Sequence, residues 1–471
     1  MGEELCYLDA TELAARIRAK TVSPVEVLRA HQARIATVNP KLNAIVTLID
    51  SAEDRARAAE AAVMRGERLG PLHGVPFTIK DCVDTAGVRT TRGSRLFADH
   101  VPATDATVVA RLLAAGGIPL GKTNLPEFAL WWETGNLLFG RTVNPWDPTR
   151  TTGGSSGGEA AAIAAGCSPL GIGSDVGGSI RLPAHYCGIA GLKPTHGRVP
   201  LTGHWPETLL PFMHVGPMAR TVRDVALGLA IMAGPDGHDW YAPPVPVPDL
   251  PRADAALAGV RVGWLAEPGF GPVDREVAAT IGRAAEALAK RGCRVEAARL
   301  PGLEARDCNT LTMTVFAPTA RRYFDPIIAG READLTPVLR RRLGGPLPSI
   351  EAYAAAEVEV EGLRRDVAAF FREHDVLLCP TVIVTAHPHE QAECVINGEA
   401  HPPRQVVRTT APFDLTGSPA LSVPFGWSRD GLPIGVQVVG RHFDEPTVLR
   451  VGLALEAMRD RIPAGPGHPP R

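Results

Sequence analysis

Two glycine-rich turns carry serine residues that could act as nucleophiles. The first turn has the sequence GGSSGG over residues 153–158 and runs directly into an alanine-rich segment. The second turn follows the apolar segment 170–174 and places Ser179 after a pair of glycines. Glycine frees the backbone to turn sharply and to approach other groups closely. Both turns are therefore candidate sites for acyl transfer to a serine hydroxyl.

The first turn matches the pattern Gly-x-Ser-x-Gly, which in α/β-hydrolases presents the nucleophile directly after a strand. Ser155 would then be the nucleophile. However, residues 144–152 before it contain prolines and an aspartate, which a central strand does not accommodate. A phosphate-binding loop is disfavoured because Glu159 and Ala160 replace the lysine and the Ser or Thr that end such a loop. An esterase that uses Ser155 with a histidine base is kept as an alternative.

The second turn is better placed for nucleophilic catalysis, with Ser179 as the nucleophile. We expect a strand to end at Ser174 and a helical turn to begin at Ser179. The backbone N–H groups of Val176, Gly177, Gly178 and Ser179 can converge on one point. Such a nest would hold the oxyanion of a tetrahedral intermediate, and each donor is typically worth about 3–4 kcal/mol. A tight turn that needs glycine only for packing would not explain the serine.

A serine nucleophile requires a base, and Lys80 is a candidate. The segment GVPFTIK, residues 74–80, predicts a strand that delivers Lys80 to its C-terminal end. Burial disfavours the ammonium form and lowers a lysine pKa from about 10.4 by up to several units, so that the neutral amine can accept a proton. A surface lysine at a strand end is the alternative. Histidines nearby in sequence, with no spacing that distinguishes one of them, are His185, His196, His204 and His214.

Three segments together resemble the amidase signature family, which includes fatty acid amide hydrolase and many bacterial amidases. They are GVPFTIKD around Lys80, TTGGSSGGEAAAIAAG at 151–166 and LGIGSDVGGSIRLPAHYCGIAGLKPTHGRVP at 170–200. The spacing agrees as well, because Ser155 follows Lys80 by 75 residues and Ser179 follows Ser155 by 24. An ordered set of this kind is far more specific than a single glycine-serine run.

The resemblance extends from about Asp9 to the segment TGSPALSVPFGWSRDGLPIGVQVVG at 416–440 and is weakest at about 235–375. Asp414 stands where many relatives have asparagine, and Glu159 stands where a small residue is common. Residues 201–213 also differ from the corresponding segment of the glutaminase component of tRNA-dependent amidotransferases. This difference disfavours a role as the glutaminase of a multi-subunit complex.

The resemblance implies a Ser–cis-Ser–Lys triad. Ser179 would be the nucleophile, Ser155 would follow a cis peptide bond and relay the proton, and neutral Lys80 would be the base. Ser155 would hand its proton to the leaving nitrogen, which must be protonated as it departs. Water would then release the acyl group from Ser179. Supporting roles are implied for Ser156 and for an ion pair between Asp175 and Arg181 that braces the turn.

Strands and helices alternate along most of the chain, which predicts an α/β protein. The expected fold is a single large α/β/α domain with a mixed, mostly parallel central sheet covered by helices. A capping box at residues 23–26 and a strand–helix–strand pattern at 259–298 are the clearest local signals. The domain would span residues 1–461, with a less regular, substrate-shaping region at about 235–375 and a flexible Pro/Gly tail at 462–471.

The overall charge excludes several classes of protein. The 471 residues carry 49 Lys+Arg against 51 Asp+Glu, which leaves no basic excess for nucleic acid or an anionic membrane. We expect no membrane span and no signal peptide, and the 8 cysteines lack the paired spacing of zinc or redox sites. We expect a cytoplasmic monomer or homodimer that uses no metal or organic cofactor and acts on a small-molecule amide or carbamate.

Large apolar residues gather in the less regular segments, although aromatic residues make up only 5% of the chain. They predict an apolar, aryl-accepting pocket with few charges to fix a carboxylate, although some of them could belong to the core instead. Neutral carboxamides, anilides or carbamates are the expected substrates, with esterase activity as a side reaction. A binding protein or complex subunit without independent hydrolysis stays open. The candidate pocket residues are Trp131, Trp132, Leu137, Trp205, Phe212, Met213, Met313 and Phe316.

Overall fold

The structure, a computed structural model, describes residues 2–247, 249, 256–267 and 269–460. The predicted tail at 462–471 lies outside the described residues. An 11-stranded sheet runs through the molecule in the order β1 (Ile45–Leu48), β3 (Ile118–Thr123), β2 (Pro76–Lys80), β6 (Leu170–Asp175), β8 (His214–Ala219), β7 (Ala190–Lys193), β14 (Ala420–Trp427), β15 (Pro433–Gly440), β11 (Val376–Pro380), β9 (Arg261–Trp264) and β10 (Arg294–Ala297). Two small sheets pair β4 (Gly135–Asn136) with β5 (Gly140–Arg141) and β12 (Cys394–Ile396) with β13 (Glu399–His401).

The prediction of one domain with a mixed, helix-covered sheet is confirmed. The prediction that most of its strands pair in parallel is wrong. Parallel pairs join β3, β2 and β6 on one side and β11, β9 and β10 on the other. The strands between β6 and β11 all pair antiparallel, and so does β1 at the edge. One cause is the hairpin of β14 and β15, whose turn is closed by a hydrogen bond from Ser428 N–H to Leu432 O. Such a short connection can join only antiparallel strands.

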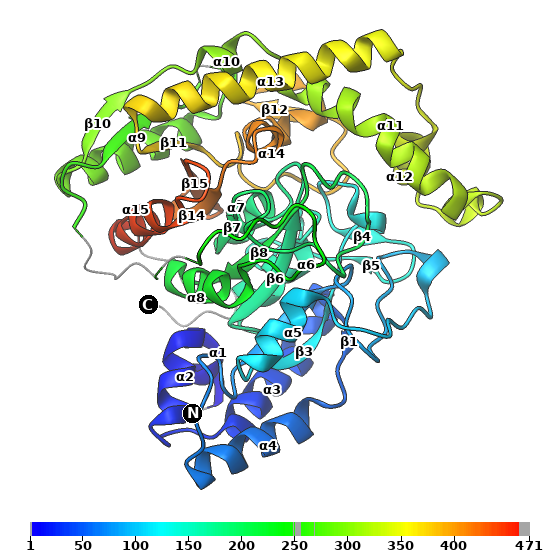
Figure 1. Cartoon of the computed structure of the whole chain (residues 1–471), viewed down its shortest axis with the longest axis vertical. Helices are drawn as coiled ribbons and strands as arrows, with labels where there is room; N and C mark the ends of the chain where they lie inside the picture. Colours follow the sequence, from blue (N-terminus) through cyan, green and yellow to red (C-terminus); the bar gives the residue numbers. More distant parts are fainter. Residues whose placement is uncertain (1, 248, 250–255, 268, 461–471) are drawn as a thin grey trace.

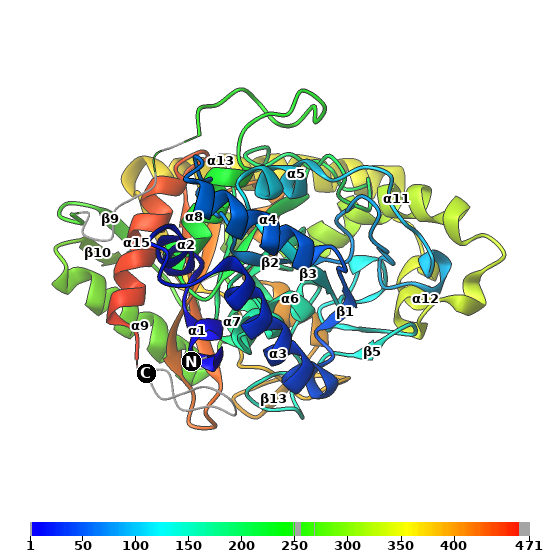
Figure 2. The ribbon, with the colours of Figure 1, turned by 90° about the horizontal axis from the view of Figure 1, so that it is seen from below.

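Helices cover the sheet in layers (Figure 1). One layer packs α8 (Val222–Met232), α15 (Glu445–Met458) and α9 (Arg275–Lys290) on the central strands, and a second packs α6 (Gly157–Ala164) against α7 (Arg181–Cys187). The N-terminal helices and α13 (Ile350–Glu373) lie at opposite ends of the molecule in Figure 1, and Figure 2 shows the N-terminal helices from below. The remaining helices are α1 (Gly2–Tyr7), α2 (Ala10–Arg18), α3 (Pro24–Leu42), α4 (Ala52–Arg65), α5 (Thr107–Ala114), α10 (Pro301–Glu304), α11 (Cys308–Ile328), α12 (Pro337–Gly344), α14 (Ala411–Leu415) and the 3-10 segments η1 (Arg95–Phe97), η2 (Glu127–Ala129), η3 (Glu332–Asp334) and η4 (Pro403–Val407).

The local sequence signals are confirmed where they are strongest. Ser23 caps α3, because its hydroxyl accepts from Glu26 N–H while the Glu26 carboxylate accepts from Ser23 N–H. Helix α4 ends at Gly66, whose φ of 72° is one that glycine adopts without steric cost. The predicted strand–helix–strand unit is β9, α9 and β10, with the two strands parallel.

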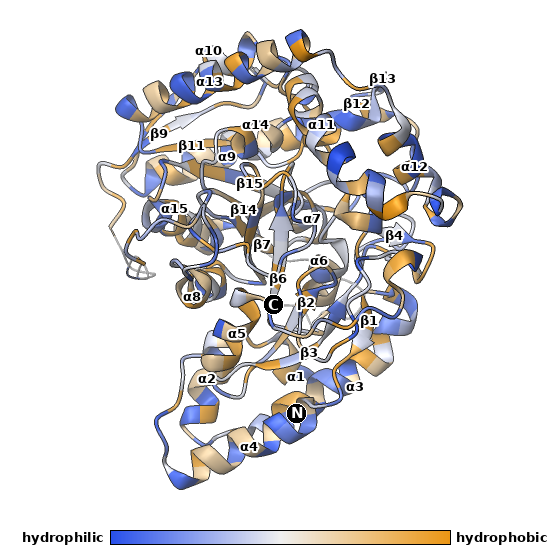
Figure 3. Ribbon diagram, turned by 45° about the vertical axis from the view of Figure 1, so that its right-hand side comes forward, coloured by the Kyte–Doolittle hydropathy of each residue, from blue (hydrophilic) through white to orange (hydrophobic). Residues whose placement is uncertain are grey.

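The core lies between the sheet and its helices, and every residue of β2 and β6 is buried. Figure 3 shows hydrophobic and hydrophilic residues alternating along the outer helices α4 and α13, as expected for helices with one face on the core. Within the described ranges, no helix combines the length and apolar character that crossing a membrane would require. The two buried strands β2 and β6 are parallel neighbours, so their carboxyl ends meet at one edge of the sheet.

Candidate active site

Lys80 ends β2 at this edge and is fully buried. Its Nζ donates to Ser155 Oγ at 2.7 Å and to Ser174 Oγ at 3.0 Å. Ser174 lies near the end of β6, and Ser155 precedes α6. The parallel pairing of β2 with β6 therefore brings together side chains that are 75 and 94 residues apart in the sequence.

The environment of Lys80 favours its neutral form. Burial lowers the pKa of Lys80 to about 8, because an ammonium loses its hydration there, and the nearby Cys82, Asp175 and Glu159 oppose the shift. A substantial fraction of Lys80 is therefore neutral at mildly alkaline pH. A neutral amine in contact with a serine hydroxyl can accept its proton.

The turn that contains Ser155 is fixed by its neighbours Gly154 and Ser156. The peptide bond between Gly154 and Ser155 is cis, as the resemblance implies. The next residue, Ser156, accepts from Ser174 N–H with its hydroxyl at 3.3 Å, and its own N–H donates to Ser179 O at 3.2 Å. A side chain on Gly154 would collide with the backbone at Trp131, 2.8 Å away. Ser156 thus joins the first turn to the second.

The second turn presents Ser179 just before α7, half-buried at the edge of a cavity. Val176, Gly177 and Ser179 line this cavity, and Gly178 does not. The Gly178 N–H donates to Asp175 Oδ1 at 2.6 Å, so the expectation that it serves as an oxyanion donor is wrong in this conformation. Its φ of 120° and the nearness of Thr410, 2.3 Å from an added Cβ, explain why glycine is required there.

A buried ion pair holds the turn from behind. Asp175 accepts from Arg181 Nε and Nη2, each at 3.0 Å, and both side chains are fully buried. Asp175 also accepts from Ile180 N–H at 3.0 Å. Burial alone would raise the pKa of Asp175, but the Arg181 guanidinium and these donors hold it far below its usual range. The predicted bracing pair is therefore present.

Asp414 is the third member of this cluster. It lies 2.8 Å from Arg181 Nη2 and is fully buried. Burial and the neighbouring Asp175 charge raise the pKa of Asp414 well above its usual value, although Arg181 opposes this. Asp414 is therefore protonated more readily than Asp175, which Arg181 and the backbone donors keep ionised. In its neutral form the Asp414 carboxyl is close in shape and hydrogen bonding to the side chain of asparagine.

The opposite pKa shifts of Asp414 and Asp175 predict that two matched substitutions will change the free energy of unfolding by different amounts. Asp414→Asn replaces the carboxyl that is protonated more readily by a neutral side chain of nearly the same shape, so the free energy of unfolding should change by less than about 1 kcal/mol. Asp175→Asn removes the ionised partner of a buried guanidinium and should cost about 3–5 kcal/mol. Urea unfolding of both variants at pH 7 measures the difference. Equal losses would contradict the assignment of the charge to Asp175.

Glu159 occupies a buried position behind Lys80. Its carboxylate accepts from the Thr123 hydroxyl at 2.8 Å and from the Thr78 hydroxyl. Burial raises the pKa of Glu159 to about 7, against the effect of these donors and of Lys80. An added Cβ on Gly171 would overlap the Glu159 carboxylate. Glycine at position 171 therefore leaves the space that the glutamate side chain at position 159 occupies.

The cavity next to Ser179 has a volume of about 60 Å³. Of the predicted pocket residues, it contains Trp131, Trp132 and Phe316. Trp131 and Trp132 stack with ring centroids 3.6 Å apart. Thr312 of α11 and Ala411 of α14 also line it.

The other predicted pocket residues do not line this cavity. Trp205 and Phe212 are buried in the core, where Trp205 packs against Phe128 and Phe324. Met213 is buried in a second core cluster, and Leu137 is 40% exposed along a different cavity. Met313 is half-buried on α11 but is absent from the lining. Composition alone indicates that these residues are large and apolar; it does not separate core positions from pocket positions.

The expectation of a pocket with few charges is also wrong. Arg342 of α12 and Arg404 of η4 both line the cavity with Ser179. Sequence reasoning missed them because arginine is common on surfaces, and neither residue belongs to a recognisable motif. Only the packing of α12 and η4 beside the second turn identifies them.

The four candidate histidines lie away from the serine pair. Among the described residues, none of them bonds to Ser155 or Ser179. His204 lies 3.7 Å from Cys82 Sγ, His185 accepts from Gly435 N–H, His196 contacts Leu210 O, and His214 lies 3.1 Å from Lys193 Nζ. The part of the chain that the structure describes also contains no group of three or more His, Cys, Asp or Glu residues arranged to hold a metal ion.

Comparisons with known proteins agree with this arrangement. The Amidase family matches residues 26–449. The chain is 38% identical to the glutamyl-tRNA(Gln) amidotransferase A-type subunit of Roseiflexus sp. (strain RS-1) and 36% identical to an acylamidase of Rhodococcus erythropolis, with 97% and 98% of both chains covered. A solved bacterial aryl acylamidase of the amidase signature family has a TM-score of 0.87 at 29% identity, covering 96% of each chain.

The chain therefore belongs to the amidase signature family of hydrolases. Its likeness to the amidotransferase component extends over nearly all of both chains. The local difference at residues 201–213 consequently does not set the chain apart from that component.

Proposed function

We propose that the protein hydrolyses the C–N bond of linear amides, including anilides and carbamates, through an acyl-enzyme on Ser179. The observation that carries this proposal is the 2.7 Å hydrogen bond between buried Lys80 and Ser155, beside the turn that presents Ser179. A lysine whose pKa is lowered by burial is suited to start a proton relay. Esters would be cleaved as a side activity, because the same backbone donors bind the carbonyl oxygen of either substrate.

The relay begins with neutral Lys80. Lys80 Nζ accepts the proton of Ser155 Oγ, and Ser155 Oγ accepts that of Ser179 as the Ser179 oxygen attacks the carbonyl carbon. The developing oxyanion is bound by backbone N–H groups of Val176, Gly177 or Ser179, since Gly178 is engaged with Asp175.

Collapse of the tetrahedral intermediate then breaks the C–N bond. Ser155 donates its proton to the leaving nitrogen, which departs as an amine, and Lys80 returns its proton to Ser155. Water attacks the acyl-Ser179 ester with the same base, and the acid product leaves. The relay returns to its starting protonation state, so no external acid, base or cofactor is consumed.

A substrate panel tests this proposal. Purified protein should hydrolyse at least one class among anilides, primary amides, carbamates and p-nitrophenyl esters, with release of amine or p-nitrophenol above the rate of a Ser179→Ala control. The prediction fails if every class reacts at the control rate. That result would favour a binding protein or a complex component without independent hydrolysis.

A second candidate function is the glutaminase of an amidotransferase complex. It is favoured by the 38% identity to a glutamyl-tRNA(Gln) amidotransferase component over 97% of both chains. Release of ammonia from glutamine, with no activity on anilides, would support it over the first proposal. The esterase alternative with Ser155 as nucleophile is disfavoured, because the hydrogen-bond partner of Ser155 is Lys80 and the segment before it forms no strand.

A further inference from the structure

Two arginines face the cavity of Ser179 without being held by other groups of the protein. Arg342 lies near the end of α12 and Arg404 in η4. Within the described ranges, neither guanidinium has a hydrogen bond or ion pair. Arg404 Nε is buried without any partner. Free guanidinium donors at a cavity are available to a ligand.

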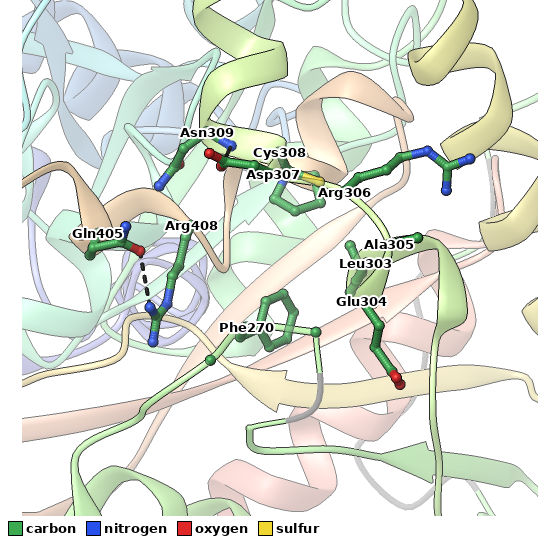
Figure 4. Close-up of a pocket in the computed structure, with 13 residues that line it drawn as sticks. Phe270, Leu303, Glu304, Ala305, Arg306, Asp307, Cys308, Asn309, Gln405 and Arg408 are labelled. Carbon is green, nitrogen blue, oxygen red and sulfur yellow. Dashed lines mark hydrogen bonds between the residues drawn. The ribbon is translucent and has the colours of Figure 1, made fainter. Parts of the chain in front are cut away.

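The arginines of the neighbouring cavity provide a contrast (Figure 4). This second cavity, of about 550 Å³, lies along the start of α11 and the end of η4. There Arg306 donates to Glu359 at 2.8 Å and to Asp366 at 2.7 Å, and Arg408 donates to Gln405 at 3.0 Å and to the carbonyl of Pro272. These arginines contribute to the structure, whereas Arg342 and Arg404 have no such engagement.

The charges of Arg342 and Arg404 favour the binding of an anion. Burial lowers the pKa of Arg342 to about 10. Burial and the charge of Arg342 lower the pKa of Arg404 to about 9, and Asp307 opposes this shift. Both residues remain cationic at neutral pH, and no acidic side chain lines the cavity among the described residues. Two neighbouring cations without a bound anion cost free energy.

We propose that Arg342 and Arg404 bind a carboxylate of the substrate, so that the preferred substrates are amides carrying a carboxylate besides the scissile bond. A guanidinium matches a carboxylate in geometry and donates two parallel hydrogen bonds to it. This inference rests on the proposed hydrolysis at Ser179, because the same cavity contains both. Trp131, Trp132 and Phe316 supply apolar surface for the rest of the substrate.

The composition of the cavity also argues against a zwitterionic substrate. An α-ammonium group would lie near two cations, and the described lining offers no carboxylate to pair with it. Free glutamine should therefore be a poor substrate compared with an amide that carries only a negative charge. This expectation separates the inference from the glutaminase alternative.

Two matched substrate pairs test the inference on the wild-type protein. Succinic acid monoanilide is compared with pentanoic acid anilide, and 4-acetamidobenzoate with N-(4-methylphenyl)acetamide. Each pair has nearly the same shape and differs by one carboxylate, on the acyl side in the first and on the amine side in the second. In at least one pair the charged amide should have a kcat/KM about 10- to 100-fold higher, the range of a charge-assisted interaction.

Variants then locate the source of the preference. Arg342→Met and Arg404→Met should each lower the ratio of kcat/KM for the charged amide to kcat/KM for the neutral amide by at least about tenfold. Arg404→Lys should retain part of the preference for the charged amide. The matched control is Arg341→Gln, which removes the same charge from the same helix but from an exposed residue outside this cavity. Thermal unfolding of each variant checks that it is folded.

The outcomes separate this inference from the proposed function. If the neutral anilides are cleaved and neither charged partner is preferred, the carboxylate subsite is overturned while amide hydrolysis stands. The same holds if a preference survives both Met substitutions, or if Arg341→Gln removes it equally. If no amide in this set or in the wider panel is cleaved, the proposed function is overturned and the inference with it.

Discussion

Replacing Ser179 by alanine should lower kcat/KM for any cleaved amide by at least about 10⁴-fold. In the proposed mechanism the Ser179 hydroxyl forms the bond to the acyl group, so the substitution removes the nucleophile. Steady-state kinetics at substrate concentrations well below KM measures the loss. The residual rate would come only from substrate binding and the backbone donors.

Ser156→Ala is the matched control for this substitution, because it removes a serine hydroxyl from the same cluster without removing the nucleophile. Ser156 Oγ contacts the Ser174 backbone at 3.3 Å, so its loss should lower stability and activity only moderately. The thermal midpoint of Ser179→Ala should stay close to wild type, since Ser179 is only half-buried. Retention of more than about a tenth of wild-type activity in Ser179→Ala would contradict its role.

Replacing Lys80 by methionine should lower kcat/KM by about 10²–10⁴-fold, the usual contribution of a general base. The substitution should also abolish the rise in activity with pH that the titration of Lys80 produces. Lys80 must be neutral to accept a proton, so wild-type activity should rise with pH and level off above a pKa of about 8. An unperturbed lysine would instead place this rise near pH 10.

Lys122→Met is the matched control for Lys80. Lys122 is also fully buried, on the neighbouring strand β3, and burial lowers its pKa to about 8 as well. Its Nζ donates to Thr85 Oγ1 at 3.0 Å and to the carbonyl of Val83, away from the serine pair. Lys122→Met should lose stability but keep the rise in activity near pH 8. If the rise persists in Lys80→Met and disappears in Lys122→Met, the assignment of the base is wrong.

Much of the fold could be predicted from the sequence because its signals are local. Ser23 with Glu26 marks the start of α3, and Gly66 marks the end of α4, since caps and positive φ depend on a few neighbouring residues. The direction in which strands pair is harder to predict, because it depends on contacts between segments distant in the sequence. The antiparallel centre of the sheet around β7 and β14 is one such case.

The residues of the candidate site also differ in whether the local sequence indicates them. Lys80, Ser155 and Ser179 could be proposed as site residues because each lies in a segment that resembles the family's pattern, and the structure brings Lys80 and Ser155 into contact. Arg342 and Arg404 could not, because nothing in their own segments distinguishes a cavity arginine from a surface arginine. Their position depends on how α12 and η4 pack beside the second turn.

The central claim is that Ser179, and not Ser155, carries the acyl group, and trapping the acyl-enzyme tests it most directly. Wild-type protein is mixed with a p-nitrophenyl ester, quenched in acid during the burst of p-nitrophenol, and digested for peptide mass spectrometry. The account predicts the acyl mass on the peptide that contains Ser179, fragmenting to that residue, and none in Ser179→Ala. An acyl group on Ser155 in the wild-type protein would contradict it.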